Sequence, residues 1–96
     1  MVKVPVLYPG YSKQDRDEMI RKAAILLTRI HNVKERLKST GHEKEAMILH
    51  DFAMKIGTHD HPDLLRHDFN ELCVFAGNLR RKGIISPEEE RKLCMR

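Results

Sequence analysis

Residues 12–41 read SKQDRDEMIRKAAILLTRIHNVKERLKSTG, and this stretch decides the fold. Its apolar residues recur at alternating intervals of four and three residues, which is the spacing of one face of an α-helix. Ser12 begins a capping box with an acidic residue three positions later, and Gly41 is the residue type that commonly ends a helix. We therefore predict a long helix over about residues 13–40 with an apolar seam of Met19, Ala23, Leu26, Ile30, Val33 and Leu37.

Three further helices are predicted after this one. Apolar periodicity indicates helices over about residues 43–56 and 62–82, and Gly57 and Gly83 follow their predicted ends. Ser86-Pro87-Glu88-Glu89 combines an N-cap, a proline at the first helical position and a capping-box glutamate, which predicts a short helix over about 87–95. Short connections favour antiparallel neighbours. The expected fold is all-α, a small antiparallel helical bundle in a single domain over residues 12–96.

The first eleven residues, MVKVPVLYPGY, have a different character. Alternating valines interrupted by proline, followed by a Tyr-Pro-Gly-Tyr turn, predict an extended apolar arm rather than a helix. Because a helical core offers this arm no obvious place, we expect it to dock on the domain or on another protein. Its candidate partner-binding residues are Val4, Val6, Tyr8 and Tyr11.

The excess positive charge lies on the long predicted helix. The chain has 96 residues and a formal net charge of +4, and residues 12–40 carry eight basic and four acidic side chains. This distribution favours an acidic partner, either nucleic acid or an acidic protein surface. Beyond Ile30 the apolar stripe narrows, so we expect the C-terminal half of this helix to be uncovered. Candidate partner-binding residues there are Arg29, Val33, Lys34, Arg36, Leu37 and Lys38.

Direct nucleic-acid binding is the alternative to a protein partner. Lys22, Arg29 and Arg36 are seven residues apart and share one side of the predicted helix, and residues 80–82 form a second basic cluster. Basic residues near helix C-termini also complement the helix dipole, and the chain has neither a helix-turn-helix pattern nor aromatic residues arranged for base stacking. A homodimer is a third reading, since a heptad seam also suits self-association.

Residues 59–69, HDHPDLLRHDF, concentrate three histidines and three aspartates around one proline. A zinc site would need three or four convergent ligands, and His59, His61 and His67 converge only if the chain folds back on itself. The simpler reading is the start of a helix, with Asp60 or His61 as N-cap, Pro62 in the first turn and an aspartate near the positive helix end.

No residue pattern predicts chemistry. The chain lacks nucleotide-binding, hydrolase and paired-histidine metal motifs, so we expect no catalytic, cofactor-binding or metal residues and no enzymatic activity. Cys73 and Cys94 form neither a disulfide framework nor a zinc motif, and Cys73 reads as a small buried apolar residue. Without a signal core or a membrane-length apolar run, we expect a soluble cytoplasmic protein with reduced thiols.

The opening residues MVKVPVLYPGYSKQDRDEM, together with the length and basic balance, resemble the anti-RecBCD proteins of lambdoid (Salmonella) phages. The resemblance implies a non-enzymatic protein in the host cytoplasm. Such a protein binds the host RecBCD exonuclease–helicase through its RecC subunit and modulates it, so that phage DNA ends survive and enter phage recombination. It also implies a link to a host prolyl isomerase, for which the candidate recognition residues are Pro5, Pro9 and Pro62.

Overall fold

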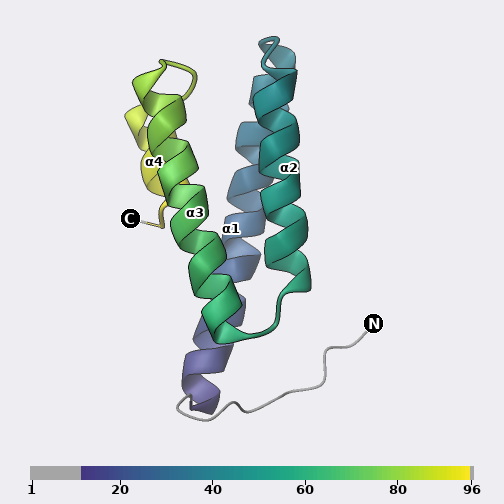
Figure 1. Ribbon diagram of the computed structural model, residues 1–96, viewed down its shortest axis with the longest axis vertical. Helices are drawn as coiled ribbons and strands as arrows, with labels where there is room; N and C mark the ends of the chain where they lie inside the picture. The colour runs from purple at the N-terminus through teal and green to yellow at the C-terminus, as the bar shows by residue number, and fades with distance from the viewer. Residues whose placement is uncertain (1–11, 96) are drawn as a thin grey trace.

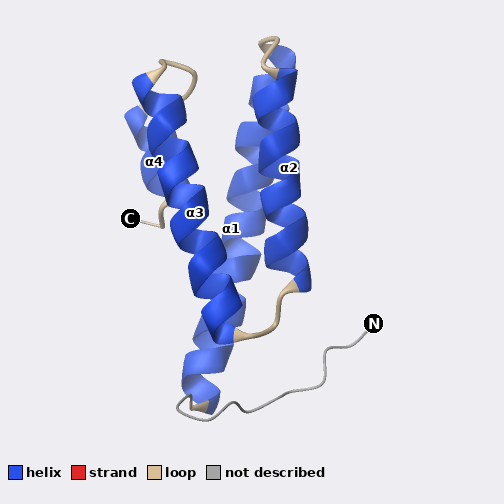
Figure 2. Cartoon of the chain, viewed as in Figure 1, coloured by secondary structure: helices blue, strands red, loops and turns tan. Residues whose placement is uncertain are grey.

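The computed structural model describes residues 12–95, which form four α-helices joined by short turns (Figure 1). The helices are α1 (Lys13–Ser39), α2 (Glu43–Thr58), α3 (Pro62–Arg81) and α4 (Pro87–Leu93). Figure 2 shows them in blue, and no strand occurs within the described residues. The predicted all-α helical bundle is confirmed. The expected arm, residues 1–11, lies outside the described residues, and so do its candidate residues Val4, Pro5, Val6, Tyr8, Pro9 and Tyr11.

The start of α1 is fixed by the predicted capping box. The backbone N–H of Asp15 donates to the Ser12 hydroxyl at 3.1 Å, and the Ser12 N–H donates to the Asp15 carboxylate at 3.2 Å. These bonds satisfy amides that no helical carbonyl can reach. At the other end, Gly41 has a φ of +84°, a left-handed conformation that glycine adopts without strain, and it turns the chain into α2.

The ends of the other helices lie within two residues of the predicted positions. Ser86 and Glu89 form the second capping box, and Pro62 and Pro87 occupy the first helical positions as predicted. The prediction that Gly57 ends α2 is wrong, because the helix continues to Thr58. The Thr58 hydroxyl donates to the Met54 carbonyl at 2.7 Å, which satisfies an acceptor in the last turn.

The helices pack as two pairs. Antiparallel α1 and α2 make the most extensive contact, while α4 folds back onto α3 and also contacts α1 (Figure 1). Between them lies one core of aliphatic side chains, which burial from water stabilises. Its members are Ala23, Leu26, Ile30, Val33, Leu37, Ala46, Leu49, Ile56, Leu65, Leu72, Ala76, Leu79, Ile85 and Leu93.

The expectation that the C-terminal half of α1 is uncovered is wrong. Val33 and Leu37 are only 5% and 0% exposed, because α2 covers one flank of this half and α4 approaches the other. The N-terminal part of α1 extends beyond the ends of the other helices instead (Figure 1). In the N-terminal half of α1, the side chains of Ile20 and Ile25 are 49% and 41% exposed. Within residues 12–95, no helix combines the length and apolar character that crossing a membrane requires.

Candidate functional site

The histidine-rich stretch is the junction between α2 and α3, and each of its histidines has a separate local role. The His61 imidazole accepts from the Asp63 backbone N–H at 3.1 Å and caps α3, as one of the two predicted caps. His67 lies on the exposed face of α3, 2.9 Å from the Glu71 carboxylate. Across the described part of the chain, no three His, Cys, Asp or Glu residues are arranged to hold a metal ion.

His59 connects the end of α2 to the interior of α3. Its Nδ1 lies 2.6 Å from the carboxylate of Asp68, which is the one buried charged residue among residues 12–95. A buried carboxylate is costly without a hydrogen-bond donor, and the imidazole N–H supplies one. We assign the pair a structural role in holding the junction.

Basic residues of α1 hold the α4 corner, which comprises residues 84–95. The Arg36 guanidinium donates to both carboxylate oxygens of Glu89, at 2.6 and 2.8 Å, and to the Ile84 carbonyl at 3.0 Å. Two helical turns earlier on α1, Arg29 donates to the Lys92 carbonyl at 3.0 Å. The predicted placement of Arg29 and Arg36 on one side of α1 is therefore correct, but that side faces α4.

Glu89 is electrostatically adapted to this corner. Burial alone would raise its pKa, but the hydrogen bonds from Arg36 and Ser86 and the positive charge of Arg36 outweigh burial. The net result is a Glu89 pKa below its ordinary value of 4.5, so the carboxylate is ionised at neutral pH. The charge pair is thus a fixed internal contact of the fold.

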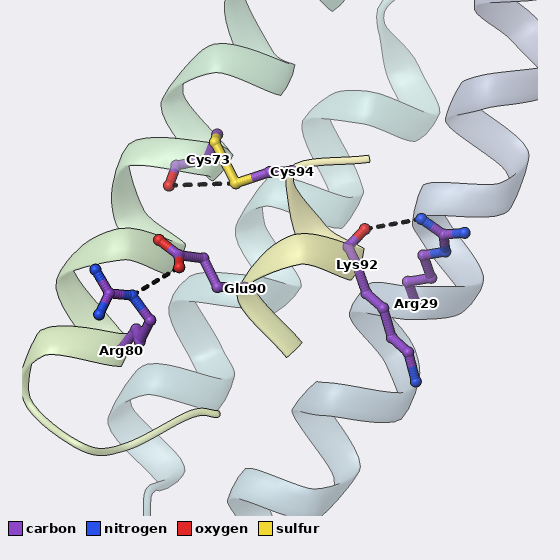
Figure 3. The surroundings of a disulfide bond; sticks show 6 residues. All are labelled: Arg29, Cys73, Arg80, Glu90, Lys92 and Cys94. Atoms are coloured by element: carbon purple, nitrogen blue, oxygen red, sulfur yellow. Dashed lines mark hydrogen bonds and ion pairs between the residues drawn. A yellow bond between two sulfur atoms is a disulfide. The ribbon is translucent and has the colours of Figure 1, made fainter. Parts of the chain in front are cut away.

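A disulfide closes the same corner from the other side. Cys73 on α3 and Cys94, the C-cap of α4, are bonded, with 4.7 Å between their Cα atoms. Figure 3 shows Cys94 reaching Cys73 from the end of α4, with Glu90 directed toward Arg80 and the Lys92 carbonyl toward Arg29. The expectation of reduced thiols is wrong for this structure. Cys73 is also only half-buried rather than a buried apolar residue.

A small residue of α3, Gly77, lies opposite α4. Gly77 is buried, and a Cβ at this position would lie 3.2 Å from a carboxylate oxygen of Glu90. The same carboxylate accepts from Arg80 Nε at 2.6 Å. Part of the predicted basic cluster at the end of α3 is therefore also used within the fold.

A shallow apolar groove runs between α2 and α3. Its volume is about 430 Å³, and its lining includes the rings of Phe52 and Phe75, whose centroids are 5.7 Å apart. Val74 also lines the groove, with 65% of its surface exposed. The polar residues of the lining are His67, Asn70, Glu71 and Asn78. Exposed apolar surface in a concave setting is a frequent property of protein-docking sites.

The residues predicted to bind a partner on α1 are divided by the structure. Val33 and Leu37 are core residues, and Arg29 and Arg36 hold the α4 corner. Lys38 is exposed beside Glu35 at 3.9 Å, and Lys34 is half-buried. The last proline candidate, Pro62, is almost fully buried in the first turn of α3. It is therefore inaccessible to a recognising enzyme in this conformation.

Sequence reasoning missed the groove, although a signal was present. Val74 lies about 200° around α3 from the seam residue Leu72, so it is an apolar residue on the side predicted to be polar. On α2, Met54 is likewise an apolar residue outside the seam and is largely exposed, although it does not line the groove. Apolar residues outside a helical seam were the feature to examine.

Comparison with known proteins gives no match: no family model, curated protein or solved structure is significantly similar to the chain.

Proposed function

We propose that the chain is a non-enzymatic phage protein that binds the host RecBCD exonuclease–helicase through RecC and modulates it in the host cytoplasm. The exposed apolar groove between α2 and α3 carries the docking part of this proposal. The partner's identity comes from the resemblance of the whole chain to phage anti-RecBCD proteins, in its length, its basic balance and its opening residues MVKVPVLYPGYSKQDRDEM. Modulation of RecBCD would protect phage DNA ends and direct them to phage recombination.

The chemistry of the groove favours a protein partner over nucleic acid. Its apolar lining comes from Phe52, Phe75 and Val74, and its polar lining includes Glu71. A protein that binds nucleic acid gains most of its affinity from cations that contact phosphates. The alternative function, a small basic helical nucleic-acid-binding protein, is weakened because Arg29 and Arg36 bind α4 instead.

Two further contact regions belong to the proposal. Lys34 and Lys38 lie on α1 away from the core. Their positive charges would suit acidic residues at the rim of the partner's contact surface. A host prolyl isomerase would recognise Pro5 or Pro9 rather than Pro62, because Pro62 is buried.

A binding and nuclease assay tests the proposal. Purified full-length protein is mixed with purified RecBCD, and we expect co-elution and altered exonuclease activity on linear duplex DNA. Val74→Glu puts a charge on the groove lining and should weaken binding about tenfold or more, as loss of a central apolar contact does. Met47→Glu is the matched control, since Met47 is 69% exposed but lies outside the groove.

The two variants distinguish the outcomes. If Val74→Glu and Met47→Glu weakened binding to RecBCD equally, the groove would not be part of the binding surface. Absence of a RecBCD complex, with a salt-sensitive shift of bare DNA that is lost on neutralising Lys34 and Lys38, would favour nucleic-acid binding. Dimerisation that Val74→Glu abolishes would instead identify a second copy of the chain as the occupant of the groove.

A further inference from the structure

The α4 corner is held against the other helices both by a disulfide and by non-covalent contacts. Cys73 and Cys94 are the only cysteines of the chain, and their Cα atoms, 4.7 Å apart, lie within the usual range for bonded cysteines. Other contacts hold α4 at the same corner. Arg36–Glu89, Arg80–Glu90 and the buried side chain of Leu93 each hold α4 in the same place. We therefore expect the fold to be the same whether the bond is closed or open.

The helix held in this way is too short to persist by itself. α4 has seven residues, and isolated helices of that length are not stable in water. Its occupancy of the corner depends on packing, on the ion pairs and on the disulfide. When α4 leaves the corner, the guanidinium groups of Arg29 and Arg36 lose their α4 acceptors and become accessible.

We propose that Cys73 and Cys94 form a reversible redox latch that controls how often α4 opens. The oxidant is a low-molecular-weight disulfide of the glutathione class. The thiolate of one cysteine attacks a glutathione sulfur, forms a mixed disulfide and releases one glutathione thiolate. The second cysteine then attacks the protein sulfur of that mixed disulfide and releases the other glutathione. One protein disulfide replaces one glutathione disulfide, and two electrons and two protons pass to the two glutathione thiols.

In the closed state the bond joins positions that are 21 residues apart and limits the excursions of α4. In the reduced state, α4 is held by the non-covalent contacts alone. Backbone amides of α4 should therefore exchange with solvent about tenfold faster or more in the reduced protein, since local opening governs exchange there. The latch makes the exposure of a basic surface on α1 dependent on the thiol–disulfide balance.

The full-length chain is equilibrated in buffers of defined glutathione-to-glutathione-disulfide ratio, trapped with N-ethylmaleimide and weighed by intact mass spectrometry. We expect a monomeric species without adducts under oxidising conditions, converting reversibly to a species with two adducts under reducing conditions. Hydrogen exchange measured on both species should show the difference concentrated in residues 87–94. The Cys73→Ser/Cys94→Ser variant is the control and should exchange like the reduced protein in every buffer.

Three results would overturn the latch. The first is that the thiols remain alkylatable in excess glutathione disulfide. The second is that the disulfide forms only between chains. The third is that α4 amides exchange at equal rates in both states. The measurement needs no partner protein, so it stands or falls independently of the proposed binding to RecBCD.

Discussion

Replacing Arg36 by Met and Glu89 by Gln, singly and together, measures how strongly the α1–α4 ion pair supports the fold. Methionine keeps the aliphatic stem of Arg36, and glutamine keeps an oxygen for the Ser86 N–H that caps α4 at 2.9 Å. The Arg36 bond to the Ile84 carbonyl is lost in both backgrounds, so it cancels in the double-mutant cycle. The cycle therefore reports the Arg36–Glu89 interaction itself.

The geometry of the pair sets the expected magnitude. Both bonds are short, at 2.6 and 2.8 Å, and the Glu89 side chain is only 20% exposed. The Arg36 side chain is 40% exposed, so solvent screens it in part. We expect a coupling free energy of about 1–1.5 kcal/mol, above the usual value for surface pairs and below that for buried ones. The control pair, Lys38–Glu35, is separated by 3.9 Å with both side chains half exposed, and should give about 0–0.5 kcal/mol.

The pair also predicts a pH dependence of stability. Because the folded-state pKa of Glu89 is lowered, its stabilising contribution is complete above the unfolded-state value near 4.5 and is lost as pH falls through the folded-state pKa. Urea denaturation followed by circular dichroism from pH 7 down to pH 3 would show this. The stability gap between the unmodified protein and Arg36→Met should narrow below that value. A coupling no larger than that of Lys38–Glu35, or a gap that is constant with pH, would refute the reasoning.

The same denaturation assay tests three further predictions. Gly57→Ala should stabilise the fold by about 0.5–1 kcal/mol, since Gly57 is helical with open space around it. Gly83→Ala should destabilise the fold by about 1–2 kcal/mol, because the φ of Gly83 is +76°. Equal effects of the two substitutions would contradict this. Leu72→Ala should cost about 2–5 kcal/mol by opening a cavity in the core, and a loss under 1 kcal/mol would mean that the site collapses fully. His59→Ala should cost about 2–3 kcal/mol at pH 7 by removing a partner of the buried Asp68 carboxylate, and adding Asp68→Asn should recover part of it; no recovery would contradict the assigned role.

The helices were predictable because local signals and long-range packing agree. The capping boxes at Ser12 and Ser86 and the seam on α1 each specify a helix without reference to other parts of the chain. Gly57 shows the limit of such signals. Glycine weakens a helix by only about 1 kcal/mol, and buried Ile56 one residue earlier anchors the last turn of α2 against the core.

The covering of α1 was not predictable from α1 alone. Its C-terminal half has a narrow apolar stripe because basic side chains flank it, and α4 supplies the matching carboxylates. The glutamates of α4 lie in its first turn, where the helix dipole favours negative charge. Glu89 and Glu90 also pair with arginines on other helices, and a sequence does not show two roles for one carboxylate.

The disulfide could have been predicted from the turn between α3 and α4. Gly83 lies ten residues after Cys73 and eleven before Cys94. If the chain reverses at Gly83 into antiparallel neighbours, residues at nearly equal distances from the turn come to lie opposite each other. The general preference for reduced thiols in cytoplasmic proteins led to the opposite expectation.

The internal use of arginines changes what the net charge implies. The formal charge of +4 arises from residues 12–40, but Arg29 and Arg36 of that segment donate to α4. A field from such residues still attracts anionic partners at long range, yet their hydrogen-bonding capacity is committed while α4 is closed. Phosphate binding needs that capacity, whereas docking of a protein on the α2–α3 groove does not. Of the two functions, protein binding is therefore the one that the closed conformation accommodates without breaking contacts of its own.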